Sequence, residues 1–408
     1  MSTPRDDVLK IFRGALAAVH GTGCVERFLA VRRLQGEVYA LALGKAAEAM
    51  LQGARSVLGQ QLRNALLVTK PGHVTRAIKD IGDVTVIEAG HPVPDSASLQ
   101  AGQAVLDFIA AAPQDAQLLF LISGGTSSLV EVLPPGVSLK DLQRLNQWLL
   151  DSGLDIHDMN ALRKRLSCIK GGRLAGYLHG RNVLQVLISD VPGDNPADIG
   201  SGLLVPEEEG HISEVPLPEW LQVLLQHSPL LEQDPSCFHG IETRVIASLD
   251  DALSAAALEA KKLGYKLQVH TERLSGDAAV AGRQLAGVVV DGPPGVHLWG
   301  GETSVAMPAN PGQGGRNQHL ALAAAEVLAK RDGVWLLAAG TDGNDGTGGA
   351  AGALVDGGTI KRGTMKYPNA AECLLRADAG SFLKQSGDLI TTGPTGTNVM
   401  DMVIGVKL

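Results

Sequence analysis

The sequence GTDGNDGTGG, residues 340–349, places two carboxylates, Asp342 and Asp345, among five glycines. Two like charges about 4 Å apart repel by about 4 kcal/mol at an effective dielectric of ~20, and a hard cation between them reverses the sign. Mg²⁺ is usually held by one or two carboxylates together with substrate phosphates, so the stretch predicts a metal–nucleotide site. The expected metal ligands are Asp342 and Asp345, and the expected nucleotide-binding residues are Gly340, Thr341, Gly343 and Asn344.

Other interpretations of this stretch use the same residue types. An EF-hand is excluded, because Ala353 stands at position twelve counted from Asp342, where a bidentate glutamate is required. A surface turn in which Asp and Asn make their own local hydrogen bonds stays open as an alternative.

The sequence SGGTSS, residues 123–128, follows the apolar run LLFLI. Small residues let backbone N–H groups approach an anion, hydroxyls add donors, and a following helix adds its positive end. The sequence is not a Walker P-loop, because GxxxxGK[ST] occurs nowhere in the chain. An ordinary β-to-α turn is the alternative. The residues expected to bind phosphate are Ser123, Gly124, Gly125, Thr126 and Ser127.

Two more carboxylates follow apolar runs. Asp190 comes directly after VLQVLIS, a usual position for a catalytic or metal-binding carboxylate, whereas Asp194 and Asp198 are expected to be turn and cap residues. Glu302, in GGETS, is expected to bind a metal ion or water, with an N-terminal cap as the alternative. The predicted metal ligands are thus Asp190, Glu302, Asp342 and Asp345.

Positive charge is expected from Lys45 and Arg316, which neutralise phosphoryl charge in the predicted catalytic set with Asp190. Both cations stand at predicted helix starts, where the helix dipole disfavours them, and such a local conflict is a signal of function. A solvated surface lysine is the alternative for Lys45. His73 and His91 are expected to make local hydrogen bonds only.

Short apolar runs that alternate with helical patterns must position these residues. Runs that are apolar on both faces, each followed by a helix, predict an α/β fold with mainly parallel sheets covered by helices. The glycine-rich loops should then gather at the carboxyl ends of the strands, where ligands bind in such sheets. The expected strands are 38–43, 65–69, 84–88, 118–122, 183–188, 244–248, 266–270, 296–300, 334–339 and 399–406, and the expected helices include 46–58, 97–111, 249–263 and 317–331.

A chain of 408 residues exceeds the size that one core usually serves, so two domains are expected. The proline- and acid-rich segment 206–240 suggests a boundary near residue 238 and a hinge. We expect a Rossmann-like α/β domain over 1–238 and a second α/β domain over 239–408.

Composition and charge limit the classes of partner that the protein is expected to bind. The net charge of −8 lacks the basic footprint of nucleic-acid binding, and no apolar run approaches the ~20 residues that span a bilayer. The start of the chain predicts a helix capped by Thr3 rather than a signal peptide. Four cysteines without CxxC spacing suggest neither zinc nor disulfides. We expect a cytoplasmic protein with a small-molecule substrate, and nothing indicates its oligomeric state.

The motifs LALGKAA, LISGGTSSL, NALRKRLSCIKGGRLA, LISDVPGDNPADIGSG, GGETSV, GQGGRNQHLAL, AAGTDGNDGTGGAAGALVD and TGPTGTNVMDMVIG appear in this order. Together they resemble the class II glycerate kinases, or glycerate 2-kinases, whose C-terminal half is called the MOFRL domain. The resemblance covers essentially the whole chain. It implies two α/β domains with the active site in the cleft between them, and transfer of the γ-phosphoryl group of ATP to D-glycerate with Mg²⁺, usually at the 2-hydroxyl.

The resemblance also implies phosphate-binding roles for Lys45 and Arg316, and it brings the SGGTSS loop and the predicted carboxylates to the active site. Asp190 is the expected group to orient or deprotonate the attacking hydroxyl. The carboxylate of glycerate needs a cation, for which the available residues are Arg163, Arg165, Lys170 and Arg173.

Three alternatives stay open. Phosphorylation at the 3-hydroxyl would need only a slight repositioning of the same substrate. A hydroxypyruvate reductase would need a dinucleotide site, but no GxGxxG with a following acidic residue is visible. A non-catalytic binding module would not need carboxylates beside a phosphate loop.

Overall fold

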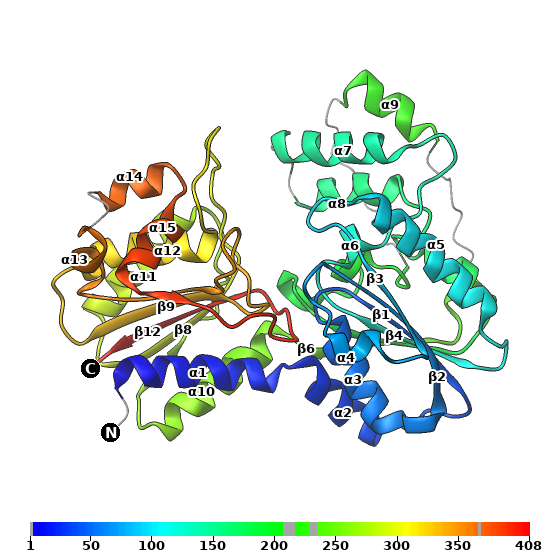
Figure 1. Cartoon of the computed structure of the whole chain (residues 1–408), viewed down its shortest axis with the longest axis horizontal. Coiled ribbons are helices and arrows are strands. Elements are labelled where there is room, and N and C mark those ends of the chain that lie inside the picture. Colours follow the sequence, from blue (N-terminus) through cyan, green and yellow to red (C-terminus); the bar gives the residue numbers. More distant parts are fainter. Residues whose placement is uncertain (1–2, 153, 155, 207–216, 228–234, 366–368) are drawn as a thin grey trace. The chain divides into compact units, whose positions relative to one another are not determined.

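The computed structural model describes residues 3–152, 154, 156–206, 217–227, 235–365 and 369–408. The chain divides into two compact units. The first unit is Gly21–Ile246, and the second combines Met1–His20 with Ala247–Leu408. Each unit has its own sheet, covered by helices (Figure 1).

The first unit contains a six-stranded sheet in the order β3-β2-β1-β4-β5-β6. β1 pairs in parallel with β2 and with β4, and the pairs β2–β3 and β4–β5 are parallel as well. Every residue of β5 is buried, as expected for a strand covered on both faces. The bounds are β1 Val38–Leu43, β2 Leu62–Thr69, β3 Val84–Glu88, β4 Gln117–Ile122, β5 Val183–Ile188 and β6 Ile241–Ala247.

Helices cover both faces of this sheet (Figure 1). α3 packs on β1, β2 and β4 with α2 beside it, and α5 packs on β2 and β3 from the opposite face. A separate apolar cluster, which includes Leu145, Leu162 and Leu221, joins α7, α8 and α9. The bounds are α2 Gly21–Val31, α3 Ala47–Leu58, α4 Arg76–Lys79, α5 Ser96–Ala111, α6 Thr126–Leu129, α7 Leu139–Asp151, α8 Ile156–Arg165 and α9 Glu219–Leu225.

The second unit contains a six-stranded sheet in the order β11-β10-β9-β12-β8-β7. β12 lies antiparallel between β8 and β9, β10 pairs antiparallel with β9 and with β11, and only the β7–β8 pair is parallel among the strands described. The bounds are β7 Leu267–Val269, β8 Gly295–Gly301, β9 Val334–Gly340, β10 Gly352–Asp356, β11 Leu389–Ile390 and β12 Asp401–Lys407.

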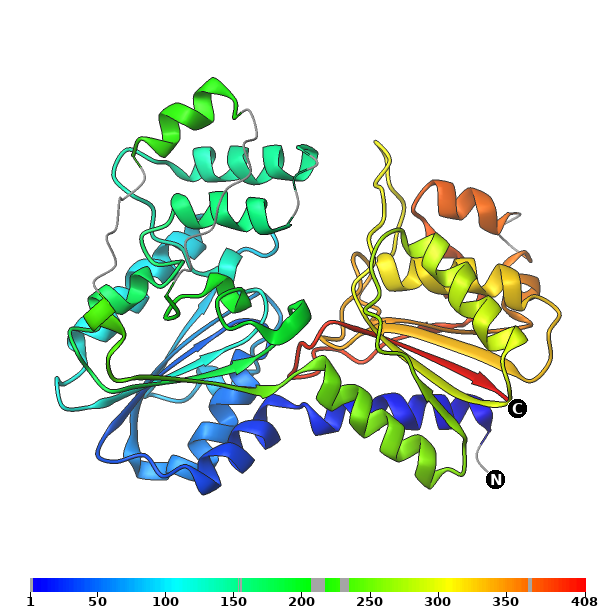
Figure 2. The ribbon, with the colours of Figure 1, turned by 180° about the vertical axis from the view of Figure 1, so that it is seen from behind.

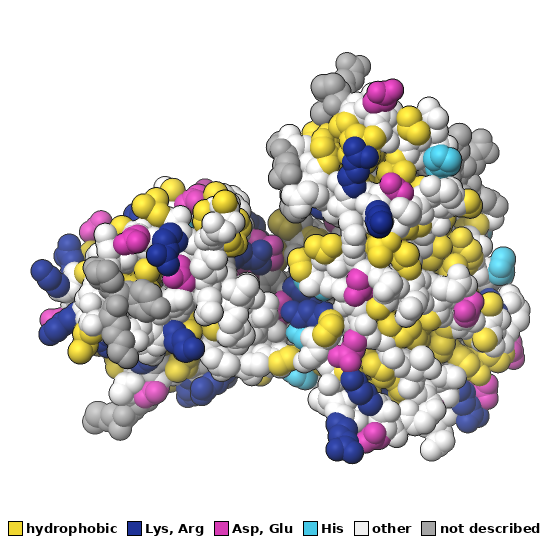
Figure 3. Space-filling view, turned by 45° about the horizontal axis from the view of Figure 1, so that its top comes forward, with side chains coloured by type: hydrophobic (Ala, Val, Ile, Leu, Met, Phe, Trp, Pro, Cys, Tyr) yellow, Lys and Arg dark blue, Asp and Glu magenta, His cyan; other side chains and the backbone are white. Residues whose placement is uncertain are grey.

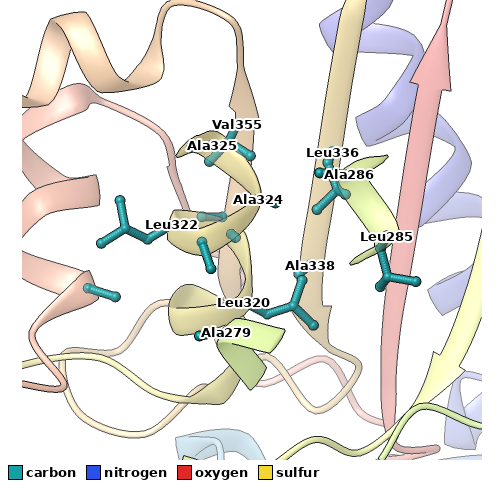
Figure 4. Close-up of a cluster of buried hydrophobic side chains, with 14 of the residues drawn as sticks. Ala279, Leu285, Ala286, Leu320, Leu322, Ala324, Ala325, Leu336, Ala338 and Val355 are labelled. Carbon is teal, nitrogen blue, oxygen red and sulfur yellow. The ribbon is translucent and has the colours of Figure 1, made fainter. Parts of the chain in front are cut away.

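Helices also cover both faces of the second sheet. α1 and α10 pack together on one face, as Figure 2 shows from behind. α11 and α12 pack on the other face, where the alanines of HLALAAAEVL let α12 lie close to both α11 and the sheet (Figure 4). The bounds are α1 Pro4–Ala18, α10 Leu249–Lys262, α11 Ala278–Asp291, α12 Arg316–Leu328, α13 Thr359–Gly363, α14 Ala370–Leu375 and α15 Ala379–Ser386.

The predicted α/β fold is confirmed, but the second sheet is mixed rather than mainly parallel. The chain after β9 turns back within residues 341–351 and pairs as β10, whereas a parallel partner would need a longer crossover connection. β12 then enters between β8 and β9 in the opposite direction. Both strands are apolar, so their hydrophobicity carried no information about direction.

The compact units also divide the chain differently from the predicted boundary at residue 238. β6 completes the first sheet, so the division falls at Ala247, and α1 belongs to the second unit because it packs on α10. α1 begins with the predicted cap, in which the hydroxyl of Thr3 accepts a hydrogen bond from the N–H of Asp6. Of the proposed hinge segment 206–240, residues 207–216 and 228–234 lie outside the described residues.

The surface shows no concentration of one charge on the face in Figure 3, where basic and acidic side chains are interspersed. Within the described part of the chain, no single helix is long and apolar enough to cross a membrane. Among the described residues, only α1 and α2 taken together, as a bent pair, are long and apolar enough to do so, judged by length and composition alone.

Two buried histidines, His297 and His319, and the half-buried His270 make the stability of the protein depend on pH. Burial lowers the pKa of His270, His297 and His319 below the ordinary 6.5, because it disfavours the charged ring. As pH falls below about 6.5, the unfolded chain takes up protons that these folded histidines do not, so the free energy of unfolding should decrease. Above that pH both states are neutral and this contribution is complete.

Urea unfolding of the wild-type protein and of His297→Leu between pH 8 and pH 5.5 checks this expectation. The decrease in the free energy of unfolding should be smaller in the variant. Asp345, whose pKa burial raises to about 6, acts in the opposite direction in both proteins, so the comparison isolates the histidine. Equal pH dependence of the two proteins would contradict the prediction.

Candidate active site

The loops after β1 and β4 lie side by side in the first unit, because these strands are neighbours in its sheet. The strand order reverses at this point, since the chain continues from β1 to β2 and β3 on one side and returns to β4 and β5 on the other. Ligands of open α/β sheets bind outside the carboxyl ends of the strands at such a switch point. Lys45 follows β1 and the SGGTSS loop follows β4, so two predicted features meet there.

Close backbone contacts hold Lys45 against the SGGTSS loop. Gly44 has a φ of +115°, and a Cβ at this position would lie 2.4 Å from the carbonyl oxygen of Ser123. The N–H of Lys45 donates to the carbonyl oxygen of Gly124 at 2.9 Å. The half-buried Lys45 side chain also lies next to Gly125, because its Cγ is 3.2 Å from the place of a Cβ there. A glycine at 125 therefore makes room for the lysine.

The residues of the SGGTSS loop fall into two sets. Ser123 and Thr126 are fully buried, and the hydroxyl of Thr126 donates to the carbonyl oxygen of Ser123 at 2.8 Å. Gly125, Ser127 and Ser128 line a pocket of about 200 Å³. α6 has only four residues, so the positive helix end expected after the loop is short. The first set holds the shape of the loop and the second faces the pocket.

Two of the cations in NALRKRLSCIKGGR, Arg163 and Lys170, line the same pocket. Lys170 forms a buried ion pair with Glu131, in which Nζ lies 2.5 Å from Oε2. Arg173 instead donates to the carbonyl oxygen of Lys164 at 2.8 Å, a structural contact at the end of α8. The sequence could not show which of these cations line the pocket and which make structural contacts, whereas the structure distinguishes them.

Asp190 and two histidines follow strands at the same edge of the sheet. Asp190 lies two residues beyond β5 and is half-buried. Nδ1 of His73 lies 3.2 Å from the carbonyl oxygen of Lys45, which confirms the local hydrogen bond predicted for His73. His91 lines the pocket beside Gly125, a placement that the sequence did not predict.

Arg316 lies between two carboxylates in the second unit. It is the first residue of α12, and Nη1 and Nη2 donate to Glu302 at 3.0 and 2.6 Å. Nε and Nη2 donate to Asp401 at 2.5 and 3.2 Å. Burial opposes the charge of Arg316, but Asp401 and Glu302 outweigh it and raise the pKa. Arg316 is therefore a permanently charged group whose orientation is fixed by paired hydrogen bonds to each of two carboxylates.

Asp345 accepts hydrogen bonds at the amino end of α12. Oδ1 accepts from the N–H of Asn317 at 3.0 Å, and Oδ2 accepts from the N–H of Gln318 at 2.8 Å. Asp345 is only 3% exposed, and burial raises its pKa to about 6 although these bonds favour the charged form. A carboxylate is favoured at a helix amino terminus. The contacts of Asp345 thus give it a capping role, and its predicted metal binding stays a prediction.

The rest of GTDGNDGTGG forms the turn between β9 and β10. Thr341 is fully buried, and its hydroxyl donates to the carbonyl oxygen of Met400 at 2.6 Å. Oδ1 of Asp342 accepts a hydrogen bond from the N–H of Asn344 at 2.9 Å, which is the local turn bond of the alternative interpretation. Asp342 is nevertheless buried, so the turn is not an ordinary surface turn.

Among the residues that the structure describes, no group of three or more His, Cys, Asp or Glu side chains is arranged to hold a metal ion. Both oxygens of Glu302 accept from Arg316, and both oxygens of Asp345 accept from the start of α12. These two predicted ligands are therefore satisfied by protein donors. Within the second unit, Glu302, Asp342 and Asp345 are therefore not arranged as a ready-made metal site.

Sequence reasoning missed two charged residues of these sites. Asp401 begins β12, and the antiparallel pairing places it opposite Gly301 and Gly340, the last residues of β8 and β9. Glu131 is fully buried and holds Lys170. The signal that could have revealed both was a lone carboxylate in an apolar segment, VMDMVIGV for Asp401 and LVEVL for Glu131.

These features define a two-unit α/β protein whose polar and charged residues gather at strand ends. The family described as "Domain of unknown function (DUF4147)" matches residues 7–215, and the MOFRL family matches residues 295–401. The D-glycerate 2-kinase of Thermotoga maritima is 37% identical, over 98% of this chain and 97% of that protein. The chain therefore belongs to the glycerate kinase family of the MOFRL type.

Other relatives match nine tenths or more of the chain. A crystal structure of a glycerate kinase from Thermotoga maritima has a TM-score of 0.84 and 36% identity, covering 99% of each chain. The glycerate 2-kinase of Pyrococcus horikoshii is 35% identical, over 91% of this chain and 88% of that protein. A relative from Agrobacterium vitis, with the provisional name hydroxypyruvate reductase, is 35% identical over 90% of this chain and 98% of its own length.

Proposed function

We propose that this protein is an ATP-dependent kinase that phosphorylates D-glycerate at the 2-hydroxyl, giving 2-phosphoglycerate and ADP. The observation that carries the proposal is the match to a D-glycerate 2-kinase at 37% identity over 98% of the chain. The switch-point loops support it, because a lysine and a glycine-rich turn at strand ends suit a phosphorylated ligand. None of the four cysteines forms a disulfide, which suits a cytoplasmic location.

Phosphoryl transfer needs positioning and charge neutralisation rather than a covalent nucleophile. In the reaction, the 2-hydroxyl oxygen forms a bond to the γ-phosphorus while the bond to the bridging oxygen breaks and ADP leaves. We assign Asp190 to orient this hydroxyl and accept its proton, and Lys45 and Arg316 to bind phosphoryl oxygens. Arg316 suits this task because Asp401 holds its guanidinium in a fixed orientation.

We assign phosphate contacts to the glycine-rich loops. In the first unit, Gly125, Ser127 and Ser128, which face the pocket, would contact phosphate, and Ser123 and Thr126 would act by holding the loop in shape. In the second unit, Gly340, Thr341, Gly343 and Asn344 are assigned to the nucleotide. Both assignments predict loss of affinity for ATP when a side chain is added at Gly125 or Gly343, each of which has a positive φ.

Mg²⁺ is the proposed companion of ATP, and it would supply charge neutralisation of the phosphates. A nucleotide-bound Mg²⁺ needs only one or two protein carboxylates. The lack of a three-ligand cluster among the described residues therefore does not argue against it. The proposed ligands stay Asp190, Glu302, Asp342 and Asp345, and binding of Mg²⁺ by Glu302 or Asp345 would replace their contacts with Arg316 or α12.

A coupled assay of ADP release with ATP and D-glycerate tests the proposal, and phosphorus NMR of the product distinguishes 2- from 3-phosphoglycerate. A 3-phosphoglycerate product would overturn the regiochemistry, and lack of ADP release would overturn the kinase assignment.

The second candidate is a hydroxypyruvate reductase, which the provisional name of the Agrobacterium vitis relative and the β3-β2-β1-β4-β5 strand order favour. The turn after β1 reads GKAAEA and lacks the GxGxxG of a dinucleotide site. Oxidation of NADH on addition of hydroxypyruvate without ATP would establish this activity instead.

A further inference from the structure

The pocket beside the SGGTSS loop has a charged wall that the kinase assignment has not yet used. The residues that line the pocket include Gly125, Ser127 and Ser128 of the loop, and also Asn146 of α7, Arg163 of α8 and Lys170. Its volume of about 200 Å³ compares with about 30 Å³ for one water molecule in the liquid. The pocket thus has room for a compound of a few heavy atoms, all within the first unit.

Arg163 is the unusual group in this wall. Its Nε donates to Oδ1 of Asn146 at 3.0 Å, and its Nη1 donates to Oδ1 of Asn160 at 3.2 Å. Among the described residues, these neutral amides are its hydrogen-bond partners, and no carboxylate oxygen lies within ion-pair distance. Burial lowers the pKa of Arg163, since no neighbouring charge compensates for the lost water.

Two other cations of these sites, Lys170 and Arg316, have carboxylate partners. Lys170, in the same wall, is paired with Glu131, which also accepts a hydrogen bond from the hydroxyl of Ser167 at 2.6 Å. Arg316 is paired with Glu302 and Asp401. A partly buried charge without a counter-charge is costly unless an anion completes the site. The guanidinium is a planar fork that matches a carboxylate through two parallel hydrogen bonds.

We propose that Arg163, oriented by Asn146, binds the carboxylate of the acceptor substrate, a small 2-hydroxy acid, in this pocket. The proposal rests on the proposed kinase function and adds the residue that selects an acid over an uncharged polyol. The 2-hydroxyl is attached to the carbon next to the carboxylate. A carboxylate at Arg163 therefore places that hydroxyl within the pocket lined by Gly125 and Ser127, with Lys45 beside Gly125.

Steady-state kinetics of Arg163→Gln and Arg163→Lys test the proposal, after the wild-type protein has been shown to phosphorylate D-glycerate. Loss of a hydrogen-bonded charge partner should raise the KM for glycerate of Arg163→Gln by about 10- to 100-fold. The KM for ATP should change by less than about 2-fold, because the nucleotide is not the partner. Arg163→Lys should lie between, since lysine keeps the charge but loses the fork. Lys140→Gln, an exposed position on α7, is the matched control for loss of one positive charge.

A second readout separates recognition from folding. The wild-type protein should prefer D-glycerate over D-glyceraldehyde, which lacks the carboxylate, and this preference in kcat/KM should shrink by a similar factor in Arg163→Gln. Calorimetric titration with D-glycerate in the absence of ATP should show the same weakening, and Asn146→Ala should show a smaller one. An unchanged KM for glycerate, or a rise in the KM for ATP alone, would overturn the proposal while leaving the kinase assignment intact. Wild-type protein without glycerate phosphorylation would instead overturn the kinase assignment itself.

Discussion

Replacement of Lys45 by Ala is expected to lower kcat/KM for glycerate phosphorylation by about 100- to 1,000-fold, the usual cost of removing one preorganised charge donor. Lys45 stands at the β1–β4 switch point, its N–H is bound to Gly124, and its side chain lies beside Gly125. Because the backbone contacts of this residue do not depend on its side chain, the fold should survive the substitution. Coupled measurement of ADP release, together with a thermal unfolding curve, provides the check.

Lys79→Ala is the control for this experiment. Lys79 also belongs to the first unit, but its side chain is exposed and pairs at the surface with Glu88 at 2.6 Å. Such surface pairs contribute about 0–1 kcal/mol, so activity and stability should both stay close to those of the wild type. Near-normal activity of a folded Lys45→Ala protein would contradict the role of Lys45.

Replacement of Arg316 by Gln should reduce both activity and stability. The expected fall in kcat/KM is again about 100- to 1,000-fold, because a fixed cation near the phosphoryl group is lost. The free energy of unfolding should also fall by up to about 3–5 kcal/mol, since Asp401, which is 4% exposed, would keep its charge without a partner. Arg316→Lys retains the charge but cannot make the paired bonds to Glu302 and Asp401, so it should be intermediate in both measurements.

The double substitution Arg316→Gln with Asp401→Asn separates the two effects. Removing both charges relieves the unpaired carboxylate, so much of the lost stability should return, while kcat/KM should stay low. Urea unfolding and the ADP assay on the two variants measure these quantities independently. Recovery of activity together with stability would mean that Arg316 acts on the fold and not on the phosphoryl group.

Much of the first unit could be predicted from hydrophobic pattern alone. The expected strands 38–43, 84–88 and 183–188 coincide with β1, β3 and β5. Lys45 and the SGGTSS loop came together as expected, because parallel strands bring their carboxyl ends to one edge whatever the details of the helices. The parallel direction of these strands follows from the alternation of strands and helices, so the placement of the loops at one edge could be predicted without knowing the strand order.

The strand directions of the second unit could not be predicted, for a physical reason. Neither the hairpin from β9 to β10 nor the direction of β12 is encoded in the apolar pattern, and antiparallel pairing brings the start of one strand to the ends of its neighbours. Asp401 therefore pairs with Arg316 although it lies at the start of a strand and not at its end. Asp345 was expected to bind a metal ion. Its carboxylate instead accepts hydrogen bonds from N–H groups at the start of α12, which is distant in sequence.

The position of β12 between β8 and β9 has a consequence for how the protein is made. Domains fold as units during synthesis, and a sheet cannot close while its central member is missing. β12, residues 401–407, is the last of the six strands of this sheet to be synthesised. Until it emerges, β9, β10 and β11 cannot join β7 and β8 in one sheet. The first unit, whose sheet ends at Ala247, has no such delay. In nascent chains, the first unit should therefore fold before the second. The apolar faces of the second unit should stay exposed to solvent until β12 has been synthesised.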